Sequence, residues 1–239
     1  MAYSRDCTIC TVEQYLKPDK IAELYKQEFI NWRGAPTDTE EAYSEAISAC
    51  LLLPENLARF EAIKPIRRES SYRVDHNDQG RTGASTRQEE LSAIEMVKCE
   101  RLYEHLGEML DYQVPLKNKR TDKAGKIDLL AYHRGDNTLR IIEYKTKETP
   151  ETLLRCVLEI YTYYRTVCRE KLCKDFGVDK AQVRPAILVY KDSTPHGDYL
   201  DEKKPNLRAL MGEWGIELFV ITGGNCPADY VIEAVQQES

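Results

Sequence analysis

Gly125-Lys-Ile-Asp-Leu-Leu-Ala-Tyr132 and Ile141-Ile-Glu-Tyr-Lys145 are two largely apolar segments that frame the turn sequence Arg134-Gly-Asp-Asn137. Both are rich in the branched and aromatic residues that strands favour. The pattern predicts two strands, 126–133 and 138–145, joined as a hairpin. This hairpin decides the fold because it determines which charged side chains share a face.

The turn fixes how the two strands pair. We place its centre between Gly135 and Asp136, so that residues equidistant from this centre face each other. Asp128 then lies directly opposite Glu143, with the two β-carbons about 5 Å apart on one face of the sheet. Lys145 shares that face because strand side chains alternate. The sequence therefore predicts three converging ionisable groups.

The surroundings of these charges are largely apolar. Two unpaired carboxylates at the margin of a buried region are costly, so a divalent cation is expected to offset their repulsion, with Lys145 as a further positive partner. The alternative is a surface hairpin with an ordinary salt bridge between Lys145 and one acid. The apolar neighbours expected on the charged face are Leu130, Tyr132, Leu139 and Ile141, and those expected on the opposite face are Ile127, Leu129, Ile142 and Tyr144.

The flanking elements are more informative than the tripeptide Glu-x-Lys itself. A carboxylate-x-lysine tripeptide alone carries little weight, because the chain has two others, at residues 201–203 and 202–204. Here, however, a helix is expected before the hairpin, from a cap at Ser85-Thr86 to about residue 110. A second amphipathic helix is expected after it, over residues 150–171.

With these helices, the hairpin resembles the active-site motif of the PD-(D/E)XK nuclease superfamily. The matching residues are Gly-Lys-Ile-Asp128 and Ile-Ile-Glu143-Tyr-Lys145. The sequence departs from the family pattern at two points. Ile127 stands where the name of the motif has proline, and the second helix carries Glu159 but no Gln, a residue that relatives often have there.

The first helix of the motif often supplies an additional glutamate in relatives. Two candidates follow each other here, Glu89 and Glu90. Glu90 shares a helix face with Ile94 and Val97, and we therefore choose it over Glu89. The alternative for Glu90 is a solvent-facing glutamate in the first turn of a helix.

The resemblance implies a nuclease that hydrolyses phosphodiester bonds of nucleic acid, with DNA favoured over RNA. Asp128, Glu143, Glu90 and the backbone carbonyl of Tyr144 would bind Mg²⁺, which prefers oxygen ligands, with Mn²⁺ as a substitute. Lys145 would orient or help deprotonate the attacking water and stabilise negative charge. The competing interpretation is a module of the same fold that binds nucleic acid or a protein partner with little or no hydrolysis.

The remaining elements predict an α/β fold. Strands are expected at 112–116, 185–190 and 216–222, and a further helix at 204–212. Helix, three strands, helix, strand, helix and strand in this order predict a mixed sheet with helices on both faces. The resemblance narrows the expected fold to a restriction-endonuclease-like αβββαβ core.

The chain is expected to divide near residue 78. Residues 1–78 would form an N-terminal helical extension and linker, and residues 79–239 the nuclease-like domain. The polar stretch 67–86 has the composition of a linker or a mobile loop. The helical extension either packs on the nuclease-like domain or serves as a protein-interaction element.

Composition indicates a soluble, cytoplasmic protein without a membrane anchor. No apolar run approaches the roughly 20 residues of a membrane span, and the N-terminus lacks the apolar core of a signal peptide. A formal net charge of −6 argues against a uniformly basic nucleic-acid binder. Two local stretches could nevertheless meet phosphates: residues 117–126, and residues 64–87 with Lys64, Arg67, Arg68, Arg73, Arg81 and Arg87.

Overall fold

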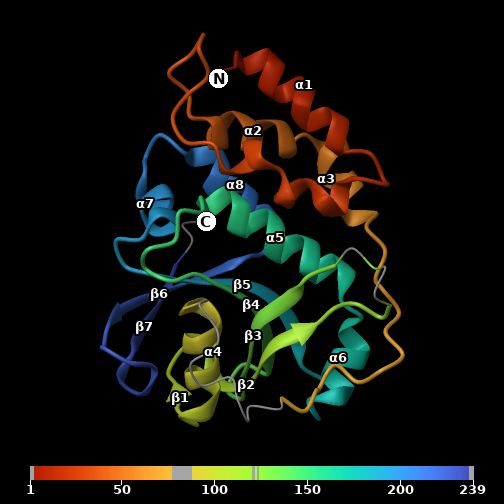
Figure 1. Ribbon diagram of the computed structural model, residues 1–239, viewed down its shortest axis with the longest axis vertical. Helices are drawn as coiled ribbons and strands as arrows, with labels where there is room; N and C mark the ends of the chain where they lie inside the picture. Colours follow the sequence, from red (N-terminus) through yellow and green to blue (C-terminus); the bar gives the residue numbers. More distant parts are fainter. Residues whose placement is uncertain (1–2, 77–87, 120–121, 123, 237–239) are drawn as a thin grey trace.

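In the described part of the chain, seven strands form one sheet, and they neighbour each other in the order in which they occur along the chain (Figure 1). The structure is a computed structural model that describes residues 3–76, 88–119, 122 and 124–236. Strand β5 runs parallel to β4 and to β6, whereas the other neighbouring pairs are antiparallel, so the predicted mixed sheet is confirmed. The strands are β1 (Leu102–Tyr103), β2 (Gly107–Pro115), β3 (Lys126–His133), β4 (Thr138–Tyr144), β5 (Gln182–Tyr190), β6 (Glu217–Gly223) and β7 (Val231–Val235).

The β3–β4 hairpin has the predicted register. Residues 129 to 133 pair with residues 142 to 138, each pair equidistant from the turn centre. Asp136 stabilises the turn, since its Oδ1 accepts a backbone N–H two residues along the chain at 3.1 Å. Asp128 and Glu143 are therefore the next residues beyond the last pair, at the open end of the hairpin.

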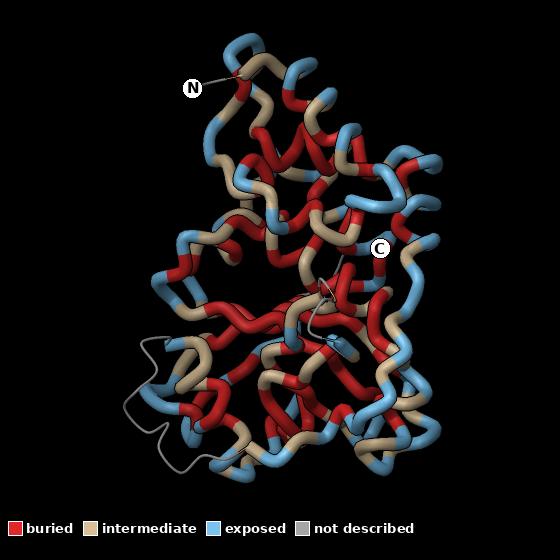
Figure 2. The backbone as a smooth tube through the Cα atoms, turned by 45° about the vertical axis from the view of Figure 1, so that its right-hand side comes forward, coloured by how far each residue is buried: buried red, intermediate tan, exposed pale blue. Residues whose placement is uncertain are grey.

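Helices cover both faces of the sheet, as predicted. α5 (Leu153–Thr166), α6 (Arg169–Asp175) and α8 (Pro205–Glu213) contribute to a larger core on one face, and α4 (Gln88–Lys98) contributes to a smaller core on the other. Figure 2 shows the buried backbone running through the middle of the molecule, with exposed segments at its margin. Leu130, Leu139 and Ile141 of the hairpin belong to the larger core, and Leu129, Ile142 and Tyr144 belong to the smaller one.

Ile127 is an exception to the predicted alternation. It belongs to the larger core together with Val114, its partner on β2, and not to the core of Leu129. Next to Val114, Gln113 adopts a φ of 50°, a left-handed conformation that costs about 1–2 kcal/mol for a residue other than glycine. This irregularity interrupts the alternation of side chains between the two faces at the end of β2. The end of β3 that pairs with it shows the same change of face.

Both helices that flank the hairpin are shorter than predicted. The first ends at Lys98, and Glu100 adopts a φ of 50° before the chain continues into β1 and β2. Its predicted cap, Ser85-Thr86, lies outside the described residues. The second helix ends at Thr166, because Val167 has an extended ψ of 139° that separates it from α6.

Four further described elements were not predicted from the sequence: β1, β7, α7 (Thr194–Leu200) and the 3₁₀ helix η3 (Pro227–Asp229). β1 and β7 are short strands at the two edges of the sheet, where one side of a strand has no neighbour. Apolar periodicity is weak in segments of this kind, because few of their side chains are buried. The predicted strands at 185–190 and 216–222 and the helix at 204–212 are present as β5, β6 and α8.

The N-terminal segment packs on α5 and α8, above them in Figure 1. Leu24, Ile47 and Phe60 of this segment lie in the same hydrophobic cluster as Leu154 of α5 and Leu210 of α8. Its apolar stripes are therefore covered by the rest of the chain. The elements of the segment are α1 (Arg5–Tyr15), the 3₁₀ helices η1 (Ile21–Lys26) and η2 (Glu28–Asn31), α2 (Tyr43–Leu51) and α3 (Pro54–Glu61).

Among the described residues, no helix combines the length and the apolar character needed to cross a membrane. All eight cysteines lie in the described part of the chain, and all are free thiols.

Candidate active site

Asp128 stands at the open end of the hairpin with both carboxylate oxygens held. The Gln113 side-chain amide donates to Oδ1 at 2.9 Å, and the Tyr144 backbone N–H donates to Oδ2 at 3.1 Å. Burial raises the pKa of Asp128 to about 7, although the charge of Lys145 and the Tyr144 N–H act in the opposite direction. The orientation of this carboxyl group is therefore fixed before any ligand binds.

Glu143 and Lys145 are both buried, with exposed fractions of 2% and 6%. Lys145 follows β4 directly, and its backbone N–H donates to the Leu188 carbonyl at 3.0 Å, which continues the ladder with β5. The ladder keeps the Lys145 side chain on the face of Glu143, and Nζ lies 2.8 Å from Glu143 Oε1. Nζ lies equally close, 2.8 Å, to Oε2 of Glu151, at the start of the segment that leads into α5. Lys145 is thus held between two carboxylates.

The buried charges shift one another's protonation. Burial raises the pKa of Glu143 well above its ordinary value, and the charge of Asp128 raises it further. Burial alone would lower the pKa of Lys145, but the carboxylates around it, Glu143 foremost, outweigh burial and raise the pKa well above its ordinary value. Lys145 is therefore protonated at neutral pH, whereas the carboxyl groups compete for the available positive charge.

On α4, Glu89 makes the contact with this cluster. Its Oε2 lies 4.0 Å from Lys145 Nζ. Burial raises the pKa of Glu89, and the charge of Lys145 opposes this shift. Glu90, which the sequence analysis ranked above Glu89, lines the pocket over Asp128. The helix therefore brings both glutamates to the site, with Glu89 facing Lys145.

α5 contributes an acidic face that sequence reasoning missed. Carboxylate oxygens of Glu143, Glu151 and Glu159 lie within 4.8 Å of one another. The Tyr163 hydroxyl donates to Glu159 at 2.6 Å. Arg155 Nε lies 3.7 Å from a carboxylate oxygen of Glu151 and 3.7 Å from one of Glu159. Glu151, Arg155, Glu159 and Tyr163 recur at every fourth position. The last three share one face of α5, and Glu151 lies just before the helix begins. That spacing was a usable signal in the sequence.

The N-terminal segment supports this acidic face at two points. The hydroxyl of Tyr25 lies 3.3 Å from the hydroxyl of Tyr163. Asn31 Oδ1 accepts the backbone N–H of Thr152 at 2.7 Å, directly after Glu151. The N-terminal segment therefore contacts residues that neighbour Glu151 and Glu159.

The site fits a hard divalent cation. Its ligand atoms are carboxylate oxygens, which Mg²⁺ prefers. Among the described residues, only two side-chain cations, Lys145 and Arg155, form ion pairs with the cluster. They face five carboxylates, so negative charge is in excess and a bound cation would offset the repulsion. These carboxylates belong to Glu89, Asp128, Glu143, Glu151 and Glu159.

The predicted ligand set is partly assembled. Asp128 and Glu143 lie close enough for the charge of one to raise the pKa of the other. Tyr144 offers its backbone alone, because its hydroxyl donates to Ser92 on the opposite face at 2.9 Å. Glu90 lies in the pocket wall. Glu151 and Glu159 are additional carboxylates that could hold a metal ion and that the resemblance did not supply.

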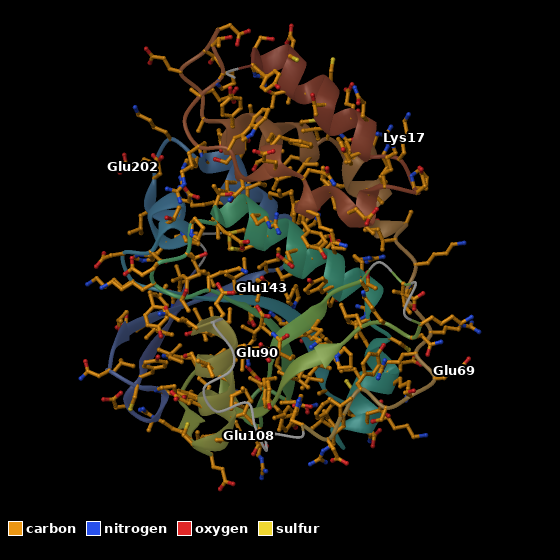
Figure 3. All side chains as sticks on the ribbon, viewed as in Figure 1. Lys17, Glu69, Glu90, Glu108, Glu143 and Glu202 are labelled. Atoms are coloured by element: carbon orange, nitrogen blue, oxygen red, sulfur yellow. The ribbon has the colours of Figure 1, made fainter. Side chains whose placement is uncertain are left out.

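A pocket of about 430 Å³ opens over Asp128. Gly125 lets the start of β3 approach α5 there: a Cβ at this position would lie 2.0 Å from the Tyr163 hydroxyl oxygen. Figure 3 shows Glu90, which lines this pocket, and Glu143 near the centre of the molecule. The pocket is lined by Glu89, Glu90, Gln113, Pro115, Lys117, Ala124, Gly125, Lys126, Asp128 and Tyr163.

Comparisons with protein-family models, with curated proteins and with solved structures gave no match for this chain.

Proposed function

We propose that this chain is a metal-dependent nuclease of the PD-(D/E)XK type, which hydrolyses phosphodiester bonds of nucleic acid and prefers DNA to RNA. One observation carries the proposal: Asp128, Glu143 and Lys145 converge at the end of a hairpin, with Lys145 Nζ 2.8 Å from Glu143 Oε1. A pocket opens beside them. An ordinary surface salt bridge would not account for two buried residues surrounded by three further carboxylates.

The topology gives independent support. α4, the three strands β2–β4, α5 and β5 follow one another in the αβββαβ order that the resemblance implies, apart from the short β1 and α6. β5 is parallel to β4, as a helical crossover between neighbouring strands requires. The catalytic strand end and the first turn of α4 thus meet at one pocket.

Asp128, Glu143 and the Tyr144 carbonyl would hold Mg²⁺ or Mn²⁺, with Glu151 and Glu159 as further oxygen donors. The bound ion would supply Lewis-acid activation of the phosphate and of the attacking water. Lys145 would act as a fixed cation, because its raised pKa keeps it protonated. It would donate a hydrogen bond to a phosphate oxygen as negative charge develops there.

The test is cleavage of single- and double-stranded DNA and RNA with Mg²⁺, Mn²⁺ or EDTA. Wild type is compared with Asp128→Ala and Lys145→Ala, and matched controls are Glu202→Ala and Lys203→Ala in the exposed carboxylate-x-lysine segment, far from Glu143 in Figure 3. Metal-dependent cutting that is lost in the first two variants and retained in the controls is the expected result. Tight binding without cutting, unchanged by any substitution, would favour the binding module instead.

A further inference from the structure

The two basic stretches of the sequence lie side by side in the structure. The Arg68 guanidinium donates to the Lys117 carbonyl, and the Glu69 backbone N–H donates to the Asn118 side chain at 2.8 Å. In Figure 1 the chain that follows α3 descends along the β2–β3 hairpin, and Figure 3 labels Glu69 on this flank. Segments about fifty residues apart in sequence thus form one surface.

This surface borders the active-site pocket. Lys117 and Lys126 line the pocket of Asp128. Lys64 lines an adjoining hollow of about 140 Å³. The two cavities share Ala124 and Tyr163 as wall residues. The two cavities are therefore neighbours, and together we call them the groove. Three lysines line it, which we call the basic flank: Lys64, Lys117 and Lys126.

The charges of the basic flank are available to a ligand. All three lysines are exposed, and none forms an ion pair with an acidic residue in the described part of the chain. Asp122, an acidic residue of the neighbouring loop, forms hydrogen bonds with the backbone. Its Oδ2 accepts the N–H groups of Asn118 (2.9 Å) and Lys119 (2.7 Å). The groove thus changes from acidic at Glu143 to basic at its outer end.

We infer that the basic flank binds the sugar-phosphate backbone of one nucleic-acid strand on one side of the phosphate to be cleaved. This inference rests on the proposed function. The acidic end of the groove requires a cation to accept a phosphate, whereas the lysine end attracts phosphates directly and gains from release of their counterions. The expected ligand is a strand of several nucleotides, because Asp128 and Lys64 line different, neighbouring cavities and each can hold a separate phosphate.

The inference is tested by binding in EDTA, where hydrolysis does not interfere. Fluorescence anisotropy of a labelled single-stranded DNA is measured across a range of NaCl concentrations. A length of roughly 20 nucleotides is sufficient for a site of this kind. The variants are Lys64→Gln, Lys117→Gln and Lys126→Gln. The controls are Lys180→Gln and Lys203→Gln, two exposed lysines that line neither cavity. Circular dichroism verifies that each variant is folded.

Each substitution in the basic flank is expected to weaken binding about three- to tenfold and to lower the slope of log affinity against log salt by about 0.7. The controls should match wild type. Flank variants that bind with the wild-type affinity and slope overturn the inference, even if the wild type cuts DNA. Lysine-dependent binding by a protein that does not cut in Mg²⁺ upholds the strand-binding surface and overturns only the nuclease. A wild type that neither binds nor cuts overturns both.

Discussion

The chain contains the same kind of tripeptide in two very different settings. In the buried tripeptide, Glu143-Tyr-Lys145, the two charged side chains are 2% and 6% exposed. In the exposed tripeptide, Asp201-Glu-Lys203, the lysine is exposed and forms no ion pair with a described acid. The tripeptide alone does not distinguish the two settings, so the difference between them arises from the surrounding fold.

The difference lies in what burial does to charge. A buried carboxylate has lost its hydration and is stabilised only by partners, whereas an exposed one is hydrated and screened. Lys145 is consequently held at 2.8 Å by both Glu143 and Glu151, with its pKa raised. The ammonium group of Lys145 is therefore held in one position, where it can stabilise negative charge, whereas Lys203 is free to move in solvent.

The largest expected difference between the two settings is in catalysis. Lys145→Met removes the ammonium group but keeps an unbranched apolar side chain. We expect it to lower the cleavage rate by about 10²–10³-fold, the usual loss when one preorganised charge is removed from an active site. Lys203→Met should cut at the wild-type rate. Equal rates for Lys145→Met and wild type, measured under single-turnover conditions in Mg²⁺, would remove Lys145 from the mechanism.

Stability should separate the two lysines as well. Lys145→Ala leaves Glu143 buried beside Asp128 and Glu151 without a positive partner, and we expect a loss of about 3 kcal/mol in the free energy of unfolding. Lys203→Ala should change it by less than about 0.5 kcal/mol. Urea denaturation in EDTA gives both values. A loss below about 1 kcal/mol for Lys145→Ala would mean that the carboxyl groups relieve the strain by taking up protons.

The pH dependence of stability should reveal the buried acid. Asp128 has a pKa of about 7 in the folded state, above the value of about 3.9 expected in the unfolded chain. The folded protein therefore binds a proton that the unfolded chain releases, and this contribution to stability is full below pH about 4 and lost as the pH rises to about 7. In EDTA the wild type should lose up to about 1.4 kcal/mol per pH unit in this window relative to Asp128→Asn.

The exposed setting supplies the control for this pH effect. Glu202→Gln should leave the slope of the wild type unchanged, because this glutamate is exposed. Mg²⁺ should raise the melting temperature of the wild type at pH 8, since metal binding requires the ionised carboxylates, and should have a smaller effect on Asp128→Asn. A wild-type stability that increases between pH 4 and 7 in EDTA by comparison with Asp128→Asn would contradict the assigned environment of Asp128.

The approach of β3 to α5 can be disturbed at a single glycine. A Cβ at Gly125 would lie 2.0 Å from the Tyr163 hydroxyl, so Gly125→Ala must displace this side chain and break its bond to Glu159. We expect a destabilisation of about 1–2 kcal/mol and reduced cleavage. Gly197→Ala, in α7 with nothing within 4 Å of the new Cβ, should be neutral or slightly stabilising. Thermal melts and cleavage rates of the two variants decide this.

The hairpin could be predicted from sequence because its geometry is local. Turn position fixes the pairing, and alternation then assigns Leu130 and Ile141 to one face and Leu129 and Ile142 to the other. Ile127 broke this rule because of the left-handed backbone at Gln113 on a different strand, a tertiary feature without a sequence signature.

The predicted end of the first helix was wrong because the apolar spacing continues past the residue at which the helix ends. Leu102 keeps the helical spacing of α4, yet Glu100 has a φ of 50° and the helix has already ended. The acidic face of α5 was different, since its spacing of four from Glu151 to Tyr163 was readable. The sequence interpretation gave this face no role, because the family pattern has a Gln in that helix and assigns nothing to Glu159.

The smallest predicted effect concerns the choice between two neighbouring glutamates on α4. Glu89 lies 4.0 Å from Lys145 and belongs to the buried setting. Glu90 lines the pocket at its side. Because the Glu89 carboxylate lies close to the Lys145 ammonium group, Glu89→Gln should lower the cleavage rate about tenfold, and Glu90→Gln, in the pocket wall, about threefold or less. Rates at saturating and limiting Mg²⁺ separate loss of metal affinity from loss of catalysis. If Glu90→Gln proves the more damaging and its defect is rescued by higher Mg²⁺, Glu90 is the metal ligand of this helix, and the contact between Glu89 and Lys145 is structural.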